Sequence, residues 1–335
     1  MIAVLVCQVG VSQSEPGEHA ASSELSVERR ARNGDPEAQD EMGLAAEERH
    51  EYAEALKWFR LAAQQGLSKS QVKVGYYYNE GLGAPKDHVE AFRWYTLAAA
   101  QGDPQAEFDL AMCYHQGEGV QSNRAAAIKW FSSALNHGYA KAANGLGLVY
   151  EFGPTSDYEE ALRWYRKGAE LGDEDAQYSA CRLTVQGLGT PRDYSEAFHW
   201  CSEAADGDES GGSSWGQFGL GRLYENGFGV KQDYAEAVEW YRKSADQGNP
   251  AAQMSLGELY SKGNGVKRDL IEAYMWIAVA GSLGHPDAVE KLQSLGSKMK
   301  NVDLSQAQAR ARGWIAQHPP DGEDNPAENI LYHYK

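Results

Sequence analysis

The chain has 335 residues, of which 42% are hydrophobic, and a formal net charge of −17 at pH 7. This hydrophobic share is sufficient for a packed interior. The negative charge argues against nucleic acid as a partner, because such affinity depends on Lys and Arg at phosphates, and equally against anionic membrane surfaces. No apolar run reaches the ~20 residues that span a bilayer as a helix, so no transmembrane segment is predicted.

The N-terminal residues 1–22 contain a short apolar run, Ile2 to Val11, which ends at a polar stretch. The run is similar to the apolar core of a secretory signal, but no Lys or Arg precedes it. We interpret residues 1–22 as a signal-like or disordered segment. Export, for example to the periplasm, is favoured over a cytoplasmic location.

From residue 58 onward a tryptophan recurs at spacings of 36, 36, 34, 36, 40 and 36 residues. A glycine follows each tryptophan eight residues later, or seven in one case. Two interlocked periods of this length indicate about seven internal repeats, each one supersecondary unit. The tryptophans are Trp58, Trp94, Trp130, Trp164, Trp200, Trp240 and Trp276, and the glycines are Gly66, Gly102, Gly138, Gly172, Gly207, Gly248 and Gly284.

Each repeat is predicted to contain two helices. The first helix carries a small residue and usually a tyrosine three positions later, so that both lie on one face and the partner helix can approach closely. In one repeat Cys181 and Thr184 stand at these two positions instead. The regular pairs are Gly75/Tyr78, Ala111/Tyr114, Gly147/Tyr150, Gly221/Tyr224 and Gly257/Tyr260.

A glycine turn such as Gly227-Phe228-Gly229 is predicted to end the first helix, because glycine adopts the left-handed conformation without strain. The second helix then begins at an aspartate cap with a glutamate three residues later. Its buried stripe is typified by Ala237, Trp240, Tyr241 and Ala245 at helical spacing. The caps are Asp87/Glu90, Asp157/Glu160, Asp193/Glu196, Asp233/Glu236 and Asp269/Glu272.

Both ends of the array depart from the repeat pattern. Residues 285–317 suggest two further helices that cap the last repeat, and the segment before Gly34, with Val27 and Ala31, reads as a capping helix at the other end. One hairpin cannot bury its apolar face alone, whereas stacked neighbours can. We therefore expect an all-α repeat solenoid over residues 23–318 and a polar tail over residues 319–335.

The repeats resemble a known family. The string Leu-Gly-x-Leu-Tyr-x-x-Gly-x-Gly-Val, followed by Asp-x-x-x-Ala-x-x-Trp-Tyr, is nearly complete over Leu220 to Tyr241 and over Leu256 to Trp276. This pattern is similar to the Sel1-like repeat, a relative of the tetratricopeptide repeat, and the segment Met299 to Trp314 looks like the tail of bacterial members. The resemblance implies a right-handed α/α superhelix that serves as a scaffold or adaptor for a protein or peptide partner.

Metal and cofactor sites are not predicted. None of the four cysteines forms a C-x-x-C pair, and the nine histidines show no H-E-x-x-H or similar ligand spacing. A disulfide between Cys181 and Cys201 is possible because both fall in one repeat, but two ordinary free thiols are favoured.

A catalytic alternative comes from two Ser-x-x-Lys motifs, Ser70 with Lys73 and Ser297 with Lys300. They match the first signature of penicillin-binding enzymes, and some cysteine-rich relatives of the family are described as β-lactamase-like. The alternative is thus a hydrolase of cell-wall or β-lactam-like substrates. The companion Ser-Asp-Asn and Lys-Thr-Gly motifs are missing. We therefore predict a non-catalytic scaffold with no catalytic residues.

In related solenoids the first helix of each repeat lines the concave face, with outward rows three before, one after and four after the small residue. Aromatic and Met side chains in these rows alternate with Asn and Arg, which is typical of an interface. The alternative is that several of them merely pack between adjacent first helices. The predicted partner-binding groove comprises Tyr76, Asn79, Phe108, Met112, His115, Asn144, Leu148, Tyr178, Arg182, Phe218, Arg222 and Glu225.

The groove is apolar in its first half and basic at Arg182 and Arg222, which occupy equivalent places in adjacent repeats and should project side by side. Arginine binds carboxylates through two parallel hydrogen bonds. We therefore expect the ligand to be an extended segment with an apolar part and an acidic part.

Overall fold

A computed structural model describes residues 27–153, 155–206 and 212–318 of the chain. Every regular element in these ranges is helical, and none is a strand. The signal-like segment 1–22 and the tail 319–335 lie outside the described residues. The chain divides into two compact units, Met1–Ser122 and Asn123–Lys335.

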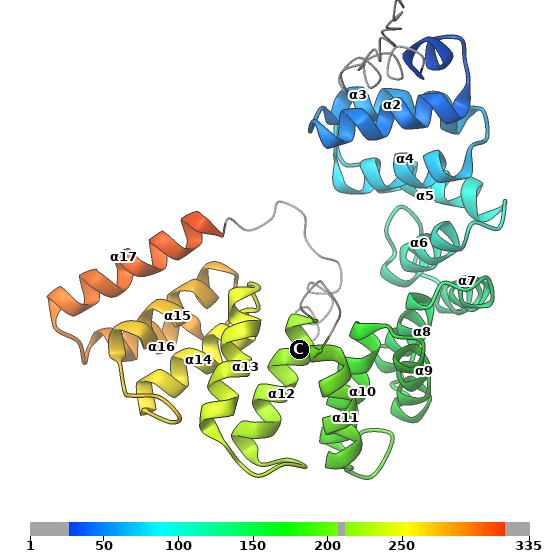
Figure 1. Cartoon of the computed structure of the whole chain (residues 1–335). Coiled ribbons are helices and arrows are strands. Elements are labelled where there is room, and N and C mark those ends of the chain that lie inside the picture. Colours follow the sequence, from blue (N-terminus) through cyan, green and yellow to red (C-terminus); the bar gives the residue numbers. More distant parts are fainter. Residues whose placement is uncertain (1–26, 154, 207–211, 319–335) are drawn as a thin grey trace, which may run out of the picture. The chain divides into compact units, whose positions relative to one another are not determined.

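In the first unit each helix packs against the next one, so that the hairpins stack in chain order (Figure 1). A short helical stretch at residues 27–32 precedes them and buries Ala31, as predicted for a capping segment. The helices are α2 (Pro36–Glu48), α3 (Tyr52–Gln64), α4 (Ser68–Glu80), α5 (His88–Ala99) and α6 (Pro104–Gln116).

Within the second unit each helix up to α15 again packs against the next one, and among its first helices α8 packs on α10 and α10 on α12. The two predicted capping helices are confirmed as α16 and α17, both of which pack on α15. The helices are α7 (Arg124–Asn136), α8 (Lys141–Glu151), α9 (Tyr158–Glu170), α10 (Glu174–Gln186), α11 (Tyr194–Ala205), α12 (Ser214–Asn226), α13 (Tyr234–Asp246), α14 (Pro250–Lys262), α15 (Leu270–Ser282), α16 (Ala288–Gly296) and α17 (Asn301–Gln317).

The predicted caps and turns form as expected. The Asp233 carboxylate accepts hydrogen bonds from the backbone N–H groups of Ala235 and Glu236, at 2.9 and 3.2 Å, and each such cap contributes about 1 kcal/mol. Gly227 ends α12 in the left-handed conformation, with φ of 70°. The second turn glycine, Gly229, lies against the backbone carbonyl of Tyr194, where a Cβ atom would collide.

The core of each hairpin is the residue that follows the repeat tryptophan. Of the predicted stripe, Ala237, Tyr241 and Ala245 are buried as expected, whereas Trp240 is only half-buried. The buried side chain lies against the small residue of the first helix, and a Cβ atom at Gly75 would be 2.6 Å from the ring of Tyr95. The predicted role of the small residue is confirmed. The core residues are Phe59, Tyr95, Phe131, Tyr165, Cys201, Tyr241 and Ile277.

Candidate protein interface on the first helices

In the first unit the predicted interface residues lie on α4 and α6, and all five are half-buried: Tyr76, Asn79, Phe108, Met112 and His115. The amide of Asn79 is already engaged, since its Nδ2 donates to Glu80 at 2.6 Å and its Oδ1 lies 2.9 Å from Nδ1 of His88. Among the other predicted residues of this unit, Tyr76 and Phe108 supply aromatic rings and Met112 a thioether side chain. Such side chains are enriched at protein interfaces.

In the second unit three predicted interface residues are buried. Leu148, Tyr178 and Phe218 are 9%, 6% and 9% exposed. The ring of Phe218 lies 5.8 Å from the ring of Tyr241, between centroids, within one core cluster. These three side chains mainly pack between helices, as the alternative interpretation of the aromatic rows expects, while Asn144 beside them is half-buried.

Arg182 forms a buried ion pair that the sequence did not indicate. Its Nη2 donates to both carboxylate oxygens of Glu151, at 2.7 Å each, and the two side chains are 16% and 4% exposed. The hydroxyl of Tyr165 donates to the same carboxylate at 2.7 Å. Burial raises the pKa of Tyr165 well above its usual range, and the Glu151 carboxylate raises it further, so the phenol stays protonated. Arg182 therefore joins α8 to α10 through Glu151.

Arg222 is exposed, and it differs from Arg182 in having no carboxylate partner among the described residues. Its guanidinium lies 5.8 Å from the ring centroid of Phe218, a distance suited to a cation–π contact. Glu225, one turn further along α12, instead accepts the hydroxyl hydrogen bond of Tyr241 at 2.6 Å. Arg222 is thus a cation available to a ligand.

Arg182 and Arg222 line one pocket between α10 and α12. The pocket is mostly apolar, with its two arginines close to the cysteine of α10. Sequence reasoning had not assigned Val185 or Phe228 to a site, although Val185 stands at an outward-facing position of its repeat. The lining residues are Tyr178, Cys181, Arg182, Val185, Gln186, Gly219, Arg222, Leu223 and Phe228.

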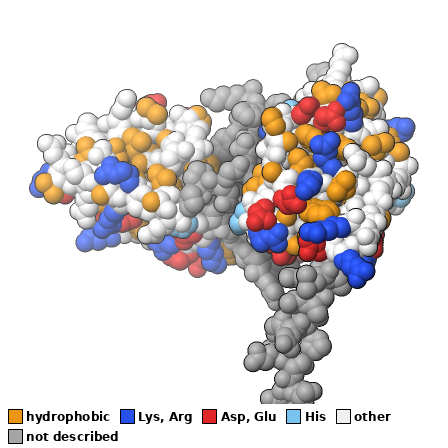
Figure 2. Space-filling model, turned by 90° about the horizontal axis from the view of Figure 1, so that it is seen from above, with side chains coloured by type: hydrophobic (Ala, Val, Ile, Leu, Met, Phe, Trp, Pro, Cys, Tyr) orange, Lys and Arg blue, Asp and Glu red, His pale blue; other side chains and the backbone are white. Residues whose placement is uncertain are grey.

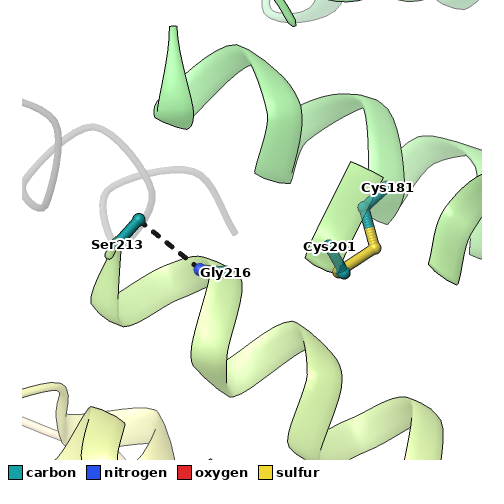
Figure 3. Close-up of a disulfide and its surroundings, with 4 residues drawn as sticks. All are labelled: Cys181, Cys201, Ser213 and Gly216. Carbon is teal, nitrogen blue, oxygen red and sulfur yellow. Dashed lines mark hydrogen bonds between the residues drawn. A yellow bond between two sulfur atoms is a disulfide. The ribbon is translucent and has the colours of Figure 1, made fainter. Parts of the chain in front are cut away.

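Cys181 and Cys201 form a disulfide that joins α10 to α11, with a Cα–Cα distance of 5.5 Å (Figure 3). The expectation of two free thiols was wrong. Cys181 stands at the small-residue position and Cys201 at the core position of the same hairpin, and these two positions are in contact in other repeats, as at Gly147 and Tyr165. The repeat register thus contained the signal, since two cysteines at contacting positions are close enough to bridge.

The residues of the hydrolase motif do not form a nucleophile with its base. Ser70 is fully buried, and its hydroxyl donates to Oδ1 of Asp40 at 2.6 Å. Lys73 pairs instead with Glu47, at 2.8 Å. Ser297 is exposed at the end of α16 and donates to the backbone carbonyl of Ser294.

Charged side chains of both signs are interspersed with hydrophobic ones on the face displayed in Figure 2. Within the ranges that the structure describes, no three His, Cys, Asp or Glu side chains are placed to hold a metal ion. None of the helices in those ranges combines the length and apolar character that crossing a bilayer requires.

Comparison with known proteins places these features in a family. The Sel1 repeat model matches residues 36–67, 68–103, 104–139, 140–173, 174–209, 216–249 and 250–285. A Sel1 repeat protein from Oxalobacter formigenes is 30% identical, with 72% of this chain and 96% of that one covered and a TM-score of 0.61.

Two further solved structures are similar. A protective antigen of uropathogenic Escherichia coli strains, which displays the same repeat fold, is 29% identical over 90% of this chain and 81% of its own, with a TM-score of 0.40. A putative Sel1 repeat protein from Klebsiella pneumoniae is 22% identical over 61% of this chain and 99% of its own, with a TM-score of 0.44. No curated protein gives a significant match. With seven matched repeats that form stacked helix hairpins, the chain belongs to the Sel1 repeat family.

Proposed function

We propose that the chain is a non-catalytic scaffold that binds a protein or peptide segment along the first helices of its repeats. Sel1 repeats typically serve as protein-interaction scaffolds. The observation that carries the proposal is the packing of α8 on α10 and of α10 on α12, which gives the second unit a continuous face with the exposed cation Arg222 on it.

The first unit supports the proposal independently. Tyr76, Phe108 and Met112 are half-exposed on its first helices. Large side chains of this kind supply the anchors that dominate binding energy at interfaces. The apolar part of the expected ligand would match these anchors, and its acidic part would match the basic site of the second unit, each unit being taken by itself.

Two further observations bear on the class of function and on the compartment. The Ser70 hydroxyl is buried against Asp40, and the motif lysine Lys73 pairs with Glu47 instead, which supports a non-catalytic role. The Cys181–Cys201 disulfide supports an oxidising compartment, since disulfides persist in secreted and periplasmic proteins and are rare in the cytosol. We therefore propose an exported, for example periplasmic, protein.

The test starts from affinity capture with the full, oxidised chain, followed by purification of the captured partner. Titration calorimetry then compares the parent with Tyr76→Ala and Arg222→Ala on the first helices. The matched controls are Leu97→Ala and Lys231→Ala, which change exposed residues outside those helices. We expect each first-helix change to weaken binding about tenfold and the controls to leave it unchanged. Equal binding by all four variants would exclude this face.

A further inference from the structure

The repeat at 174–209 lacks the tyrosine and carboxylate that close the corresponding space in its neighbours. In the flanking repeats, Tyr165 donates to Glu151 and Tyr241 donates to Glu225, at 2.7 and 2.6 Å. Cys201 stands at the tyrosine position of the intervening repeat, and Val185 stands at the position of the glutamate. Neither a ring nor a carboxylate therefore fills this part of the face, and the pocket between α10 and α12 lies there.

The lining of this pocket is mostly apolar, and its charged residues are both arginines, with Gln186 and Tyr178 as further polar residues. The disulfide, Val185 and Phe228 supply the apolar surface. Arg182 uses Nη2 alone for Glu151, and its Nε is buried without a hydrogen-bond partner. Because that Nε has almost no accessible surface, the donor of Arg182 left for a ligand is Nη1, which makes no hydrogen bond among the described residues.

Arg222 adds a positive charge at the same pocket. No carboxylate forms an ion pair with it among the described residues: Glu151 is paired with Arg182, and Glu225, one turn further along α12, accepts the hydroxyl of Tyr241. In a chain of net charge −17, this exposed cation beside apolar surface is complementary to an anion that carries an apolar group. The free volume of about 20 Å³ is close to that of a single water molecule, so it is too small for an aromatic ring and suits one methyl-sized group.

We propose that the pocket between α10 and α12 binds a carboxylate of a partner peptide, with a small aliphatic side chain of that peptide seated on the disulfide, Val185 and Phe228. Arg222 binds the carboxylate through two parallel hydrogen bonds, and the free donors of Arg182 orient it. This assignment rests on the proposed scaffold function, because it names the chemistry of the segment that the scaffold binds.

The direct test uses three probes on the full, oxidised, isotope-labelled chain, observed through the Nε–H signals of arginine in NMR spectra. They are N-acetylglycylvaline, its C-terminal amide, and N-acetylvalylaspartate amide, in which the side chain holds the carboxylate. We expect saturable shifts of the Arg182 and Arg222 signals with at least one carboxylate probe and no shift with the neutral amide. The more effective carboxylate probe identifies a chain terminus or an acidic side chain as the source.

Substitutions at Arg222 distinguish the contribution of its positive charge from that of its paired hydrogen bonds. Arg222→Gln should weaken binding of the effective probe about tenfold or more, with partial recovery in Arg222→Lys, because lysine keeps the charge but not the paired hydrogen bonds. Lys231→Gln is the control for the loss of one exposed charge. Equal shifts with acid and amide, or unchanged affinity in Arg222→Gln, would overturn the proposal.

The pocket can also be filled by replacing Cys181 and Cys201 with the two residues that stand at the equivalent positions of another repeat. The repeat at 104–139 has Ala111 and Phe131 at the two positions held here by Cys181 and Cys201, and Phe131 lies against a following glycine, as Cys201 does. The double variant Cys181→Ala with Cys201→Phe should therefore keep a helical, cooperatively melting fold and lose probe binding. The double serine variant at the same positions leaves the pocket open but removes the apolar surface of the disulfide, so it should bind the probe measurably yet more weakly than the parent.

The outcomes distinguish this proposal from the scaffold function. A captured partner that binds the first helices, but binds Arg222→Gln and the alanine–phenylalanine variant as tightly as the parent, overturns the pocket and leaves the scaffold standing. Probe binding at the pocket, without any partner on the first helices, overturns the scaffold instead. Probe binding that strengthens on removal of residues 319–335 or on dilution would assign the pocket to the chain's own tail or a second copy, and would overturn the assignment to a partner.

Discussion

Gly221 on α12 lies against the ring of Tyr241 on α13, so that a Cβ atom at residue 221 would be 2.5 Å from Cδ1 of that ring. Real Cβ atoms essentially never approach another atom so closely, and Tyr241 is fully buried with no space to retreat. The distance between the two helices of this hairpin is therefore set by the absence of a side chain.

Replacing Gly221 with leucine should consequently destabilise the chain by about 1–3 kcal/mol or more, through overpacking of the hairpin. Lys231→Leu places the same side chain at an exposed position outside the helices and should change the stability little. Thermal melts of the two variants and the parent measure the difference. Equal melting temperatures for the two leucine variants would refute the close approach at residue 221.

The disulfide should contribute to stability by restricting the unfolded chain. Its cysteines are 20 residues apart, and closing a loop of this length corresponds to about 3 kcal/mol in the chain-entropy account. A reducing agent should therefore lower the melting temperature of the parent. The double serine variant at Cys181 and Cys201 should already melt low and should not respond to the reductant. If the reductant lowered the melting temperature of this variant as much as that of the parent, the stabilisation would not come from the disulfide.

Glu151→Gln should be strongly destabilising, by about 3–5 kcal/mol, because it leaves the buried guanidinium of Arg182 without a counter-charge. Glu225→Gln is the matched control, since Glu225 accepts the equivalent tyrosine hydrogen bond but has no buried arginine to neutralise. Urea unfolding of both variants gives the comparison. Similar losses at the two sites would mean that the tyrosine hydrogen bond, rather than the ion pair, is the important contact.

Asp109 on α6 should make stability depend on pH. Burial raises the pKa of its carboxyl from 3.8 to about 7, and the charge of Asp103 adds to this effect. The folded state thus binds the proton more tightly than the unfolded state does, so the stability associated with Asp109 is present at low pH and is lost as the pH rises toward 7. Asp109→Asn should melt higher than the parent at pH 8 and depend less on pH between 5 and 8. Glu48→Gln, at an exposed position of the same unit, should leave the parent's profile unchanged.

The sequence predicted most of the fold because the relevant signals are local. The cap at Asp233 and the turn at Gly227 are each specified within a few residues, and both form as expected. The hairpin recurs along the chain, so that one correctly assigned repeat predicts the helices of the neighbouring repeats. The predicted stripe placed Trp240 and Tyr241 together in the buried face, but only Tyr241 is fully buried, because helical periodicity alone does not resolve which of two adjacent residues faces the core.

The candidate interface was less predictable because its contacts join different repeats. Glu151 and Arg182 are 31 residues apart, and nothing local indicates that the arginine is paired. The same limit applies to Leu148 and Tyr178, which stand in outward rows by register but are buried by adjacent first helices. The disulfide differs from these cases, because the two cysteines occupy positions whose contact the repeat register implies.

The contact between Gly229 and the carbonyl of Tyr194 has a consequence for how such an array can evolve. Equivalent glycines, including Gly83 against Tyr52 and Gly265 against Tyr234, make the same contact with the preceding repeat. Because these junctions are built alike, duplication or excision of one whole repeat between two of them would regenerate a valid junction at the new boundary. An insertion of a few residues inside a helix would break it. Lineages of this family can therefore lengthen or shorten the array by recombination in units of one hairpin.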